Sequence, residues 1–223
     1  MLPQLLHVAT CFPCGDCVLP ADSQSIIIDN MITGDIMNVI YLHGFASSGN
    51  SSKSDWLRRQ LDDAAHEFFS PDLPDKPREA GLFLDDYLAS FNGKAACLIG
   101  TSLGGFFAAF YGAKLGWPAV LINPLADVHD LTGSAMGENV NFASGASFIL
   151  DQADADHLYA MSDAMQHSDP GNTLLLLDKG DDVLDYHKAV ARYGKHARTR
   201  LFDGGSHRFE HLPESMPEII SLL

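Results

Sequence analysis

The chain has 223 residues, of which 46% are hydrophobic and 19% are charged, and its formal net charge at pH 7 is −15. This length fits a single domain with one core, and the composition excludes a disordered chain or a coiled coil. The acidic balance argues against nucleic acid or an anionic membrane as a partner, since both select for clustered Lys and Arg. No apolar stretch approaches the roughly 18 residues of a membrane-spanning helix, so we expect a soluble protein.

Residues 1–36 read as an extension of the domain, because they lack a sustained helix or strand period and are broken by prolines. They have neither the basic start nor the long apolar stretch of a secretory signal, so we expect a cytoplasmic protein. The segment contains Cys11, Cys14 and Cys17, while Cys97 lies in an apolar run and is expected in the core. A structural zinc site usually needs four ligands, and the second half of a paired motif is missing. A reduced extension without metal is therefore the favoured interpretation.

From residue 37 onward, short apolar runs alternate with longer amphipathic stretches, which is the pattern of strands joined by crossover helices in a mostly parallel sheet. Met37 precedes the first run and raises the hypothesis that translation starts there. The pattern predicts strands at 38–43, 67–70, 95–100, 119–123, 173–178 and 198–202. It predicts helices at 53–65, 77–91, 103–115, 184–193 and 213–222. We therefore expect an α/β domain over residues 37–223.

The longest interruption of this alternation covers residues 124–171, which contain several glycines and few long apolar runs. In an open parallel sheet, an insertion after the carboxyl end of a strand overhangs the ligand crevice. The segment is therefore a candidate lid. An ordinary surface excursion fits the same pattern equally well.

Residues 97–107 read Cys-Leu-Ile-Gly-Thr-Ser-Leu-Gly-Gly-Phe-Phe, which places Ser102 between glycines two residues before and two residues after it. An apolar run precedes this G-x-S-x-G pattern, and a helix-compatible run follows it. The pattern forces the serine into a strained conformation at a strand–turn–helix bend, and Gly100 and Gly104 allow close approach of strand and helix. Ser102 is the candidate nucleophile.

A serine hydroxyl needs a base to accept its proton, and the base needs a carboxylate that fixes its tautomer. In this type of site the acid and then the histidine follow the serine along the chain. Asp178, Asp181 and Asp182 compete for the role of the acid after the strand predicted at 173–178. Asp181 is preferred because it follows Gly180, where the chain can turn sharply. Asp182 is expected to cap the next helix, and Asp178 is still in the strand register.

The late histidines that could serve as the base are His187, His196, His207 and His211. His207 is favoured because it follows the last predicted strand, in a loop whose paired glycines allow a tight, exposed turn. His187 and His196 fall in or beside a predicted helix, where they are expected to face solvent. His211 is expected in the last helix.

The transition state of acyl transfer requires backbone N–H donors for its oxyanion. One donor is expected from Leu103, the residue after the candidate nucleophile. The other is expected from the loop after the first predicted strand, where Phe45 is the candidate. His43 lies in the same loop, precedes the serine, and is interpreted as a loop-positioning residue.

With these residues in place, the chain resembles the YqiA/YcfP-like family of small bacterial esterases, within the α/β-hydrolase superfamily, over about residues 37–221. The pieces that carry the resemblance are Tyr41-Leu42-His43-Gly44-Phe45, Ser47-Ser48, Gly100-Thr101-Ser102-Leu103-Gly104-Gly105-Phe106, Ile122-Asn123-Pro124, Gly180-Asp181-Asp182-Val183-Leu184-Asp185-Tyr186 and Gly204-Gly205-Ser206-His207-Arg208-Phe209. The resemblance implies an α/β-hydrolase fold with a short lid, and activity on carboxylic esters or acyl thioesters. It also implies Ser102 as the nucleophile, Asp181 as the acid and His207 as the base. The family often has glutamate where this chain has Asp182, and residues 1–36 have no counterpart in it.

The sequence thus predicts a serine esterase that hydrolyses small acyl esters through an acyl-enzyme, with no metal or organic cofactor. An acyl-CoA thioesterase or acyltransferase with the same triad is one alternative, and Lys53, Arg58 and Arg59 are the only nearby cluster for its phosphates. A catalytically silent hydrolase-fold protein that binds an acyl ligand or a partner protein is another.

Overall fold

The computed structural model describes residues 36–62, 64, 66–165 and 172–223. The extension predicted over residues 1–36 lies outside the described residues except for its last residue. Cys11, Cys14 and Cys17, with the question of metal binding there, lie outside them as well.

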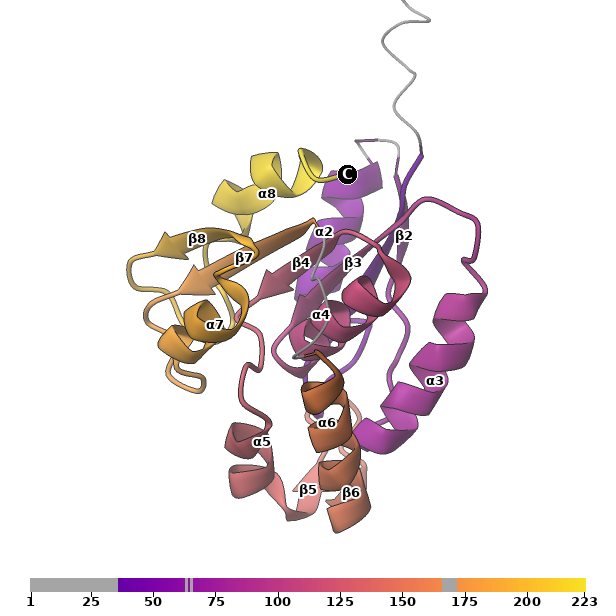
Figure 1. Ribbon diagram of the computed structural model, residues 1–223, viewed down its shortest axis with the longest axis vertical. Coiled ribbons are helices and arrows are strands. Elements are labelled where there is room, and N and C mark those ends of the chain that lie inside the picture. Colours follow the sequence, from indigo (N-terminus) through magenta and orange to yellow (C-terminus); the bar gives the residue numbers. More distant parts are fainter. Residues whose placement is uncertain (1–35, 63, 65, 166–171) are drawn as a thin grey trace, which may run out of the picture. The chain divides into compact units, whose positions relative to one another are not determined.

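The described residues contain a six-stranded sheet in which every neighbouring pair is parallel, in the order β2-β1-β3-β4-β7-β8 (Figure 1). The four inner strands are mostly apolar and wholly buried, as expected for a parallel sheet covered on both faces. The strands are β1 Asn38–Leu42, β2 Glu67–Phe69, β3 Ala96–Thr101, β4 Ala119–Ile122, β7 Thr173–Asp178 and β8 Arg198–Phe202. The structure confirms the six predicted strands, with bounds that differ by one residue at most.

Helices cover both faces of the sheet. Leu57 of α2 and Ile219 of α8 pack on one face with Val39 and Tyr41, while residues of α3, α4 and α7 pack on the other face. These helices are α2 Ser52–Asp62, α3 Pro77–Ala89, α4 Leu103–Leu115, α7 Tyr186–Tyr193 and α8 Leu212–Ile220. All five helices were predicted, although α2 ends three residues early and α7 starts two residues late. None of the helices in the described ranges is long and apolar enough to cross a membrane.

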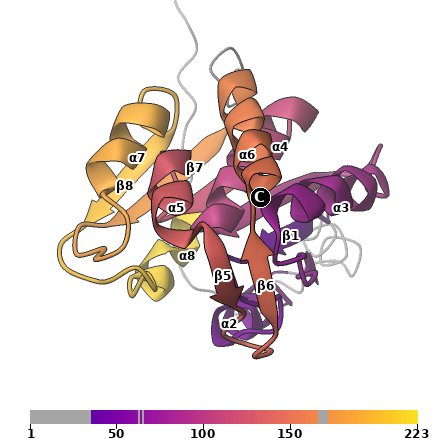
Figure 2. The same ribbon diagram turned by 90° about the horizontal axis from the view of Figure 1, so that it is seen from below.

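The segment after β4 forms four elements that the sequence pattern does not predict. They are α5 Val128–Ala135, β5 Gly137–Val140, β6 Ser147–Leu150 and α6 Gln152–Met165. The two strands pair as an antiparallel hairpin, and α6 packs against α3 and α5. Figures 1 and 2 show α5, the hairpin and α6 grouped together beyond the sheet. The described part of this segment thus consists largely of helices and a hairpin.

Because all six strands are parallel, their carboxyl ends lie along one edge of the sheet. The segments that follow β1, β3, β4, β7 and β8 therefore meet there, as is typical of ligand sites in open α/β sheets.

Cys97 of β3 is fully buried, as expected. Its burial raises the pKa of the thiol to about 12, so this cysteine is a core residue.

Candidate active site

Ser102 occupies the turn between β3 and α4, where its backbone adopts φ 57° and ψ −122°. A positive φ is costly for a residue with a Cβ and persists only where the surroundings enforce it. Packing enforces it here, because a Cβ on Gly100 would overlap the Gly104 carbonyl, and a Cβ on Gly104 would overlap the Leu42 carbonyl oxygen. The two glycines let α4 start directly against β1 and β3, which presents the Ser102 side chain at the sheet edge.

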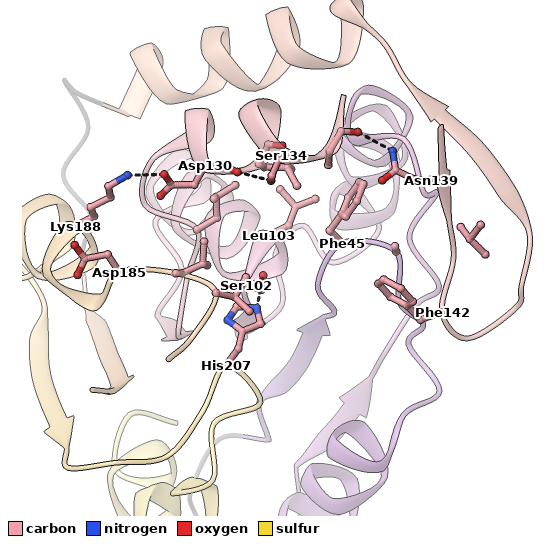
Figure 3. Close-up of a pocket in the computed structure, with 17 residues that line it drawn as sticks. Phe45, Ser102, Leu103, Asp130, Ser134, Asn139, Phe142, Asp185, Lys188 and His207 are labelled. Atoms are coloured by element: carbon pink, nitrogen blue, oxygen red, sulfur yellow. Dashed lines mark hydrogen bonds and ion pairs between the residues drawn. The ribbon is translucent and has the colours of Figure 1, made fainter. Parts of the chain in front are cut away.

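His207 and Asp181 meet Ser102 at this edge. The Nε2 atom of His207 lies 3.1 Å from Ser102 Oγ, and its Nδ1 atom lies 2.9 Å from Asp181 Oδ2 and 3.0 Å from Asp181 Oδ1. Figure 3 shows the imidazole of His207 beside Ser102. A carboxylate only accepts hydrogen bonds, so Nδ1 carries the hydrogen, and Nε2 of the neutral ring is free to accept from the hydroxyl. The arrangement can move a proton from Ser102 to His207.

The carboxylate of Asp181 is almost fully shielded, with 2% of its side chain exposed. Burial by itself would raise its pKa. Hydrogen bonds from His207 and from the backbone N–H groups of Leu184 and Val183 outweigh burial, so the pKa of Asp181 is lowered. The group is therefore an anion that orients His207 and can stabilise its protonated form.

The other two aspartates have different partners. Asp178 is completely buried and accepts from His211 Nδ1 at 2.7 Å and from the Glu210 N–H at 2.8 Å. Asp182 accepts a 3.4 Å hydrogen bond from the His207 N–H.

The expectation that Asp182 caps the next helix is wrong. Asp185 caps α7 by accepting from the His187 N–H, because the helix begins at Tyr186. His187 and His196 are exposed, as expected, whereas His211 stands just before α8 and not within it.

Asn123 holds the histidine loop in place. It follows β4 with φ 38°. Its Nδ2 donates to the Ser206 carbonyl at 3.0 Å, and its Oδ1 accepts from the Asp178 N–H at 2.9 Å. The sequence patterns predict no role for this residue. The one available signal is an amide side chain placed directly after a buried strand.

The two candidate oxyanion donors lie in the segment after β1, which contains Phe45, and at the start of α4, where Leu103 lies. Leu103 is the first residue of α4, and within the described chain neither its N–H nor that of Phe45 donates to another protein group. His43 accepts from the Leu73 N–H at 2.8 Å and donates through Nδ1 to the Gly44 carbonyl at 2.9 Å. Its burial lowers its pKa, so it is a neutral residue that fixes the loop.

These groups open into a cavity of about 770 Å³. Ser102, His207, Phe45 and Leu103 all line it, and Figure 3 shows them around one space. Other apolar side chains in its wall are Ala46, Leu125, Leu131, Ala135, Val140, Phe142, Val183 and Leu184. At one end lie the charged residues Asp130, Asp185 and Lys188, and Lys188 is paired with Asp130 and, at 3.4 Å, with Asp127.

No group of three His, Cys, Asp or Glu side chains in the described part of the chain is arranged to hold a metal ion.

Lys53, Arg58 and Arg59 do not line the cavity. The Nζ atom of Lys53 instead lies 3.5 Å from Oγ1 of Thr101, the residue before Ser102. Desolvation lowers its pKa to about 8, and attraction to Asp178 opposes part of that shift.

A family model described as "Uncharacterised protein family (UPF0227)" matches residues 38–223. Among solved structures, Est1E from Butyrivibrio proteoclasticus with ferulic acid bound is similar at 13% identity, covering 83% of this chain and 87% of that chain with a TM-score of 0.62. A monoacylglycerol lipase from Paleococcus ferrophilus is similar at 14% identity, covering 82% and 92%, with a TM-score of 0.66. Mouse alpha/beta hydrolase domain-containing protein 10 is similar at 15% identity, covering 82% and 89%, with a TM-score of 0.62. At these identities the likeness shows a shared α/β-hydrolase fold.

Proposed function

The chain belongs to the UPF0227 family, and on that premise we propose that it is a serine esterase that hydrolyses carboxylic esters of small acyl substrates through an acyl-enzyme. The observation that carries the proposal is the continuous set of hydrogen bonds from Asp181 through His207 to Ser102, with distances of 2.9 Å and 3.1 Å. Ser102 Oγ and His207 Nε2 are thus within the distance for proton transfer, and Asp181 accepts the hydrogen bond that orients His207.

In the proposed reaction, Ser102 Oγ attacks the ester carbonyl carbon while His207 Nε2 takes the hydroxyl proton. The carbonyl oxygen becomes an oxyanion that accepts hydrogen bonds from the Leu103 and Phe45 N–H groups. The bond to the leaving alcohol then breaks as His207 returns the proton to the alcohol oxygen. A water molecule repeats the sequence on the acyl-enzyme and releases the carboxylic acid and free Ser102. Asp181 stabilises the protonated ring throughout.

The cavity supports a small, mainly apolar acyl group. Its volume of about 770 Å³ falls within the range of small-molecule sites. One of the similar structures has ferulic acid bound, and an aromatic acyl group of that size is a reasonable probe for this chain.

The thioesterase alternative has less support, because the phosphates of CoA require free cations near the site. The cation that lines the cavity, Lys188, is already paired with two carboxylates. The silent binding protein has less support as well, since binding alone would not require the transfer geometry at Ser102.

The test is hydrolysis of p-nitrophenyl esters of increasing acyl length, with Ser102→Ala and Asp181→Asn as variants. We expect turnover on short to medium chains that falls to the uncatalysed rate in Ser102→Ala. Equal turnover in wild type and Ser102→Ala, or none in either on esters and thioesters, would reject the proposal.

A further inference from the structure

The loop that carries the candidate oxyanion donor Phe45 is strained. Ala46, the next residue, has φ 51°, in the left-handed region that a residue with a Cβ rarely adopts. Such a conformation is energetically unfavourable and needs surrounding contacts to persist. The direction of the Phe45 N–H therefore depends on what holds residues 45–47.

The β5–β6 hairpin provides those contacts, although it lies about 95 residues further along the chain. The Phe142 N–H donates to the Ala46 carbonyl at 2.9 Å, and Asn141 Nδ2 donates to the Ser47 carbonyl at 3.0 Å. The ring of Phe45 packs edge-on against that of Phe148, with centroids 5.4 Å apart. Each of the three loop residues is thus held by the hairpin.

The side chain of Asn141 forms hydrogen bonds with both the hairpin turn and the loop after β1. Its side chain is buried, with 6% of the residue exposed. Its Oδ1 accepts from the N–H groups of Ala143 at 2.8 Å and Ser144 at 2.9 Å, which closes the hairpin turn. Its Nδ2 donates to Asp75 as well as to the Ser47 carbonyl. All polar atoms of the amide are used, so the side chain has one well-defined position.

We propose that Asn141 is a positioning residue for the oxyanion hole, which makes the hairpin tip a fixed part of the active site instead of a lid that opens. This inference rests on the proposed esterase function. Asn141 acts through the backbone of residues 45–47 and touches no reacting atom. Its loss should weaken binding of the oxyanion, which develops in the transition state and tetrahedral intermediate but is absent from the bound ester, and leave ground-state binding of the ester largely intact.

The variants are Asn141→Ala, which removes the amide and its hydrogen bonds to Ser47 and Asp75, and Asn141→Ser. A serine hydroxyl can still accept in the turn but is too short to reach the Ser47 carbonyl. Ser144→Ala is the matched control, because its side chain accepts only from the Ala146 N–H within the hairpin tip. All activity assays are carried out well below the melting temperature of the least stable variant, so that every variant is folded during the measurement.

We expect kcat to fall about 10- to 100-fold in both Asn141 variants, somewhat less than the loss from deleting an oxyanion donor, with KM changed less than threefold. The inhibition constant of a trifluoromethyl ketone, which forms an oxyanion adduct with the serine, should rise by the same factor as kcat falls. Ser144→Ala should match the wild type in both measurements.

A kcat within twofold of wild type in the folded Asn141 variants would overturn the inference, as would a fall in kcat with an unchanged ketone inhibition constant. Either result would leave the esterase proposal standing if wild-type turnover still depends on Ser102. Absence of Ser102-dependent turnover in the wild type would instead reject the proposed function itself.

Discussion

Two aspartate–histidine pairs form where β7 and β8 end, and they have different surroundings. Asp181 binds His207, whose other ring nitrogen reaches Ser102. Asp178 binds His211, and it also holds the backbone of the histidine loop through the Glu210 N–H. The same residue types thus form the proposed catalytic pair in one case and a structural pair in the other.

Replacing each carboxylate by its amide should affect kcat and stability differently at the two positions. Asp181→Asn should lower kcat by about 10⁴-fold, because an amide cannot keep the histidine in its working tautomer, and should change the urea midpoint only slightly. Asp178→Asn should lower the free energy of unfolding by about 1–3 kcal/mol and lower kcat less than tenfold. A larger loss of kcat in Asp178→Asn than in Asp181→Asn would contradict these assignments.

Lys53 should make stability depend on pH. Burial lowers its pKa from 10.5 to about 8 in the folded chain. Between these pH values the unfolded chain binds the proton that the folded chain has released, so stability rises with pH from about 8 to 10. Urea unfolding from pH 7.5 to 9.5 should show this rise in the wild type and in the control Lys195→Met, an exposed site. The rise should disappear in Lys53→Met, and its persistence there would show that another group causes it.

At the scale of elements, the site depends on how closely α4 approaches β1. The helix begins directly after Ser102, and Gly104 in its first turn faces the Leu42 and His43 carbonyl oxygens with no room for a Cβ. Backbone atoms of a buried strand cannot move away without breaking the sheet. The turn at Ser102 is therefore a packing requirement of the fold, whatever its part in catalysis.

Gly104→Ala should consequently prevent folding or lower the melting temperature by more than about 10 °C, since the added methyl group would overlap backbone oxygen atoms. Gly133→Ala is the matched control. Gly133 lies in α5 with open space around it, so alanine should raise stability by up to about 1 kcal/mol. Thermal unfolding followed by circular dichroism measures both. A Gly104→Ala protein with a wild-type melting temperature would contradict this close approach of helix and strand.

The elements differ in how well the sequence predicts them, for physical reasons. The inner strands are buried on both faces, so each appears as an uninterrupted apolar run. Strands β5 and β6 have four residues each and are half-exposed, so their pattern is too short to detect. Their position depends on Asn141 and Phe142, whose partners in the loop after β1 are distant in the sequence.

The residues of the candidate site also differ in how well the sequence predicts them. The local motifs make Ser102 and His207 the favoured candidates and Asp181 the preferred one of three aspartates, and the structure brings these three side chains together. Asn123 and Asn141 have no predicted role, because each acts through hydrogen bonds across more than 80 residues. No local pattern encodes such contacts.

At the scale of the whole molecule, every residue that lines the cavity falls between Phe45 and His207, and the family match starts at residue 38. The sheet itself starts at Asn38. We therefore propose that residues 37–223 form the hydrolase domain and that its activity does not need the preceding residues.

A chain that starts at Met37 should retain the kcat and KM of the full chain within twofold. A chain that starts at Gly44 lacks β1, which is paired on both sides, and should not fold. Ester hydrolysis and circular dichroism of both truncations test this. A large loss of kcat in a folded chain that starts at Met37 would show that residues 1–36 contribute to catalysis.

The proposed chemistry depends on Ser102 being an activated nucleophile. The most direct measurement is intact-mass and peptide mass spectrometry after treatment with a fluorophosphonate, which forms a covalent bond with an activated serine and releases fluoride. We expect one adduct per chain on the peptide that contains Ser102, no adduct in Ser102→Ala, and much slower labelling in a His207→Gln variant. An unlabelled wild-type chain, or an adduct that persists in Ser102→Ala, would show that Ser102 is not the nucleophile.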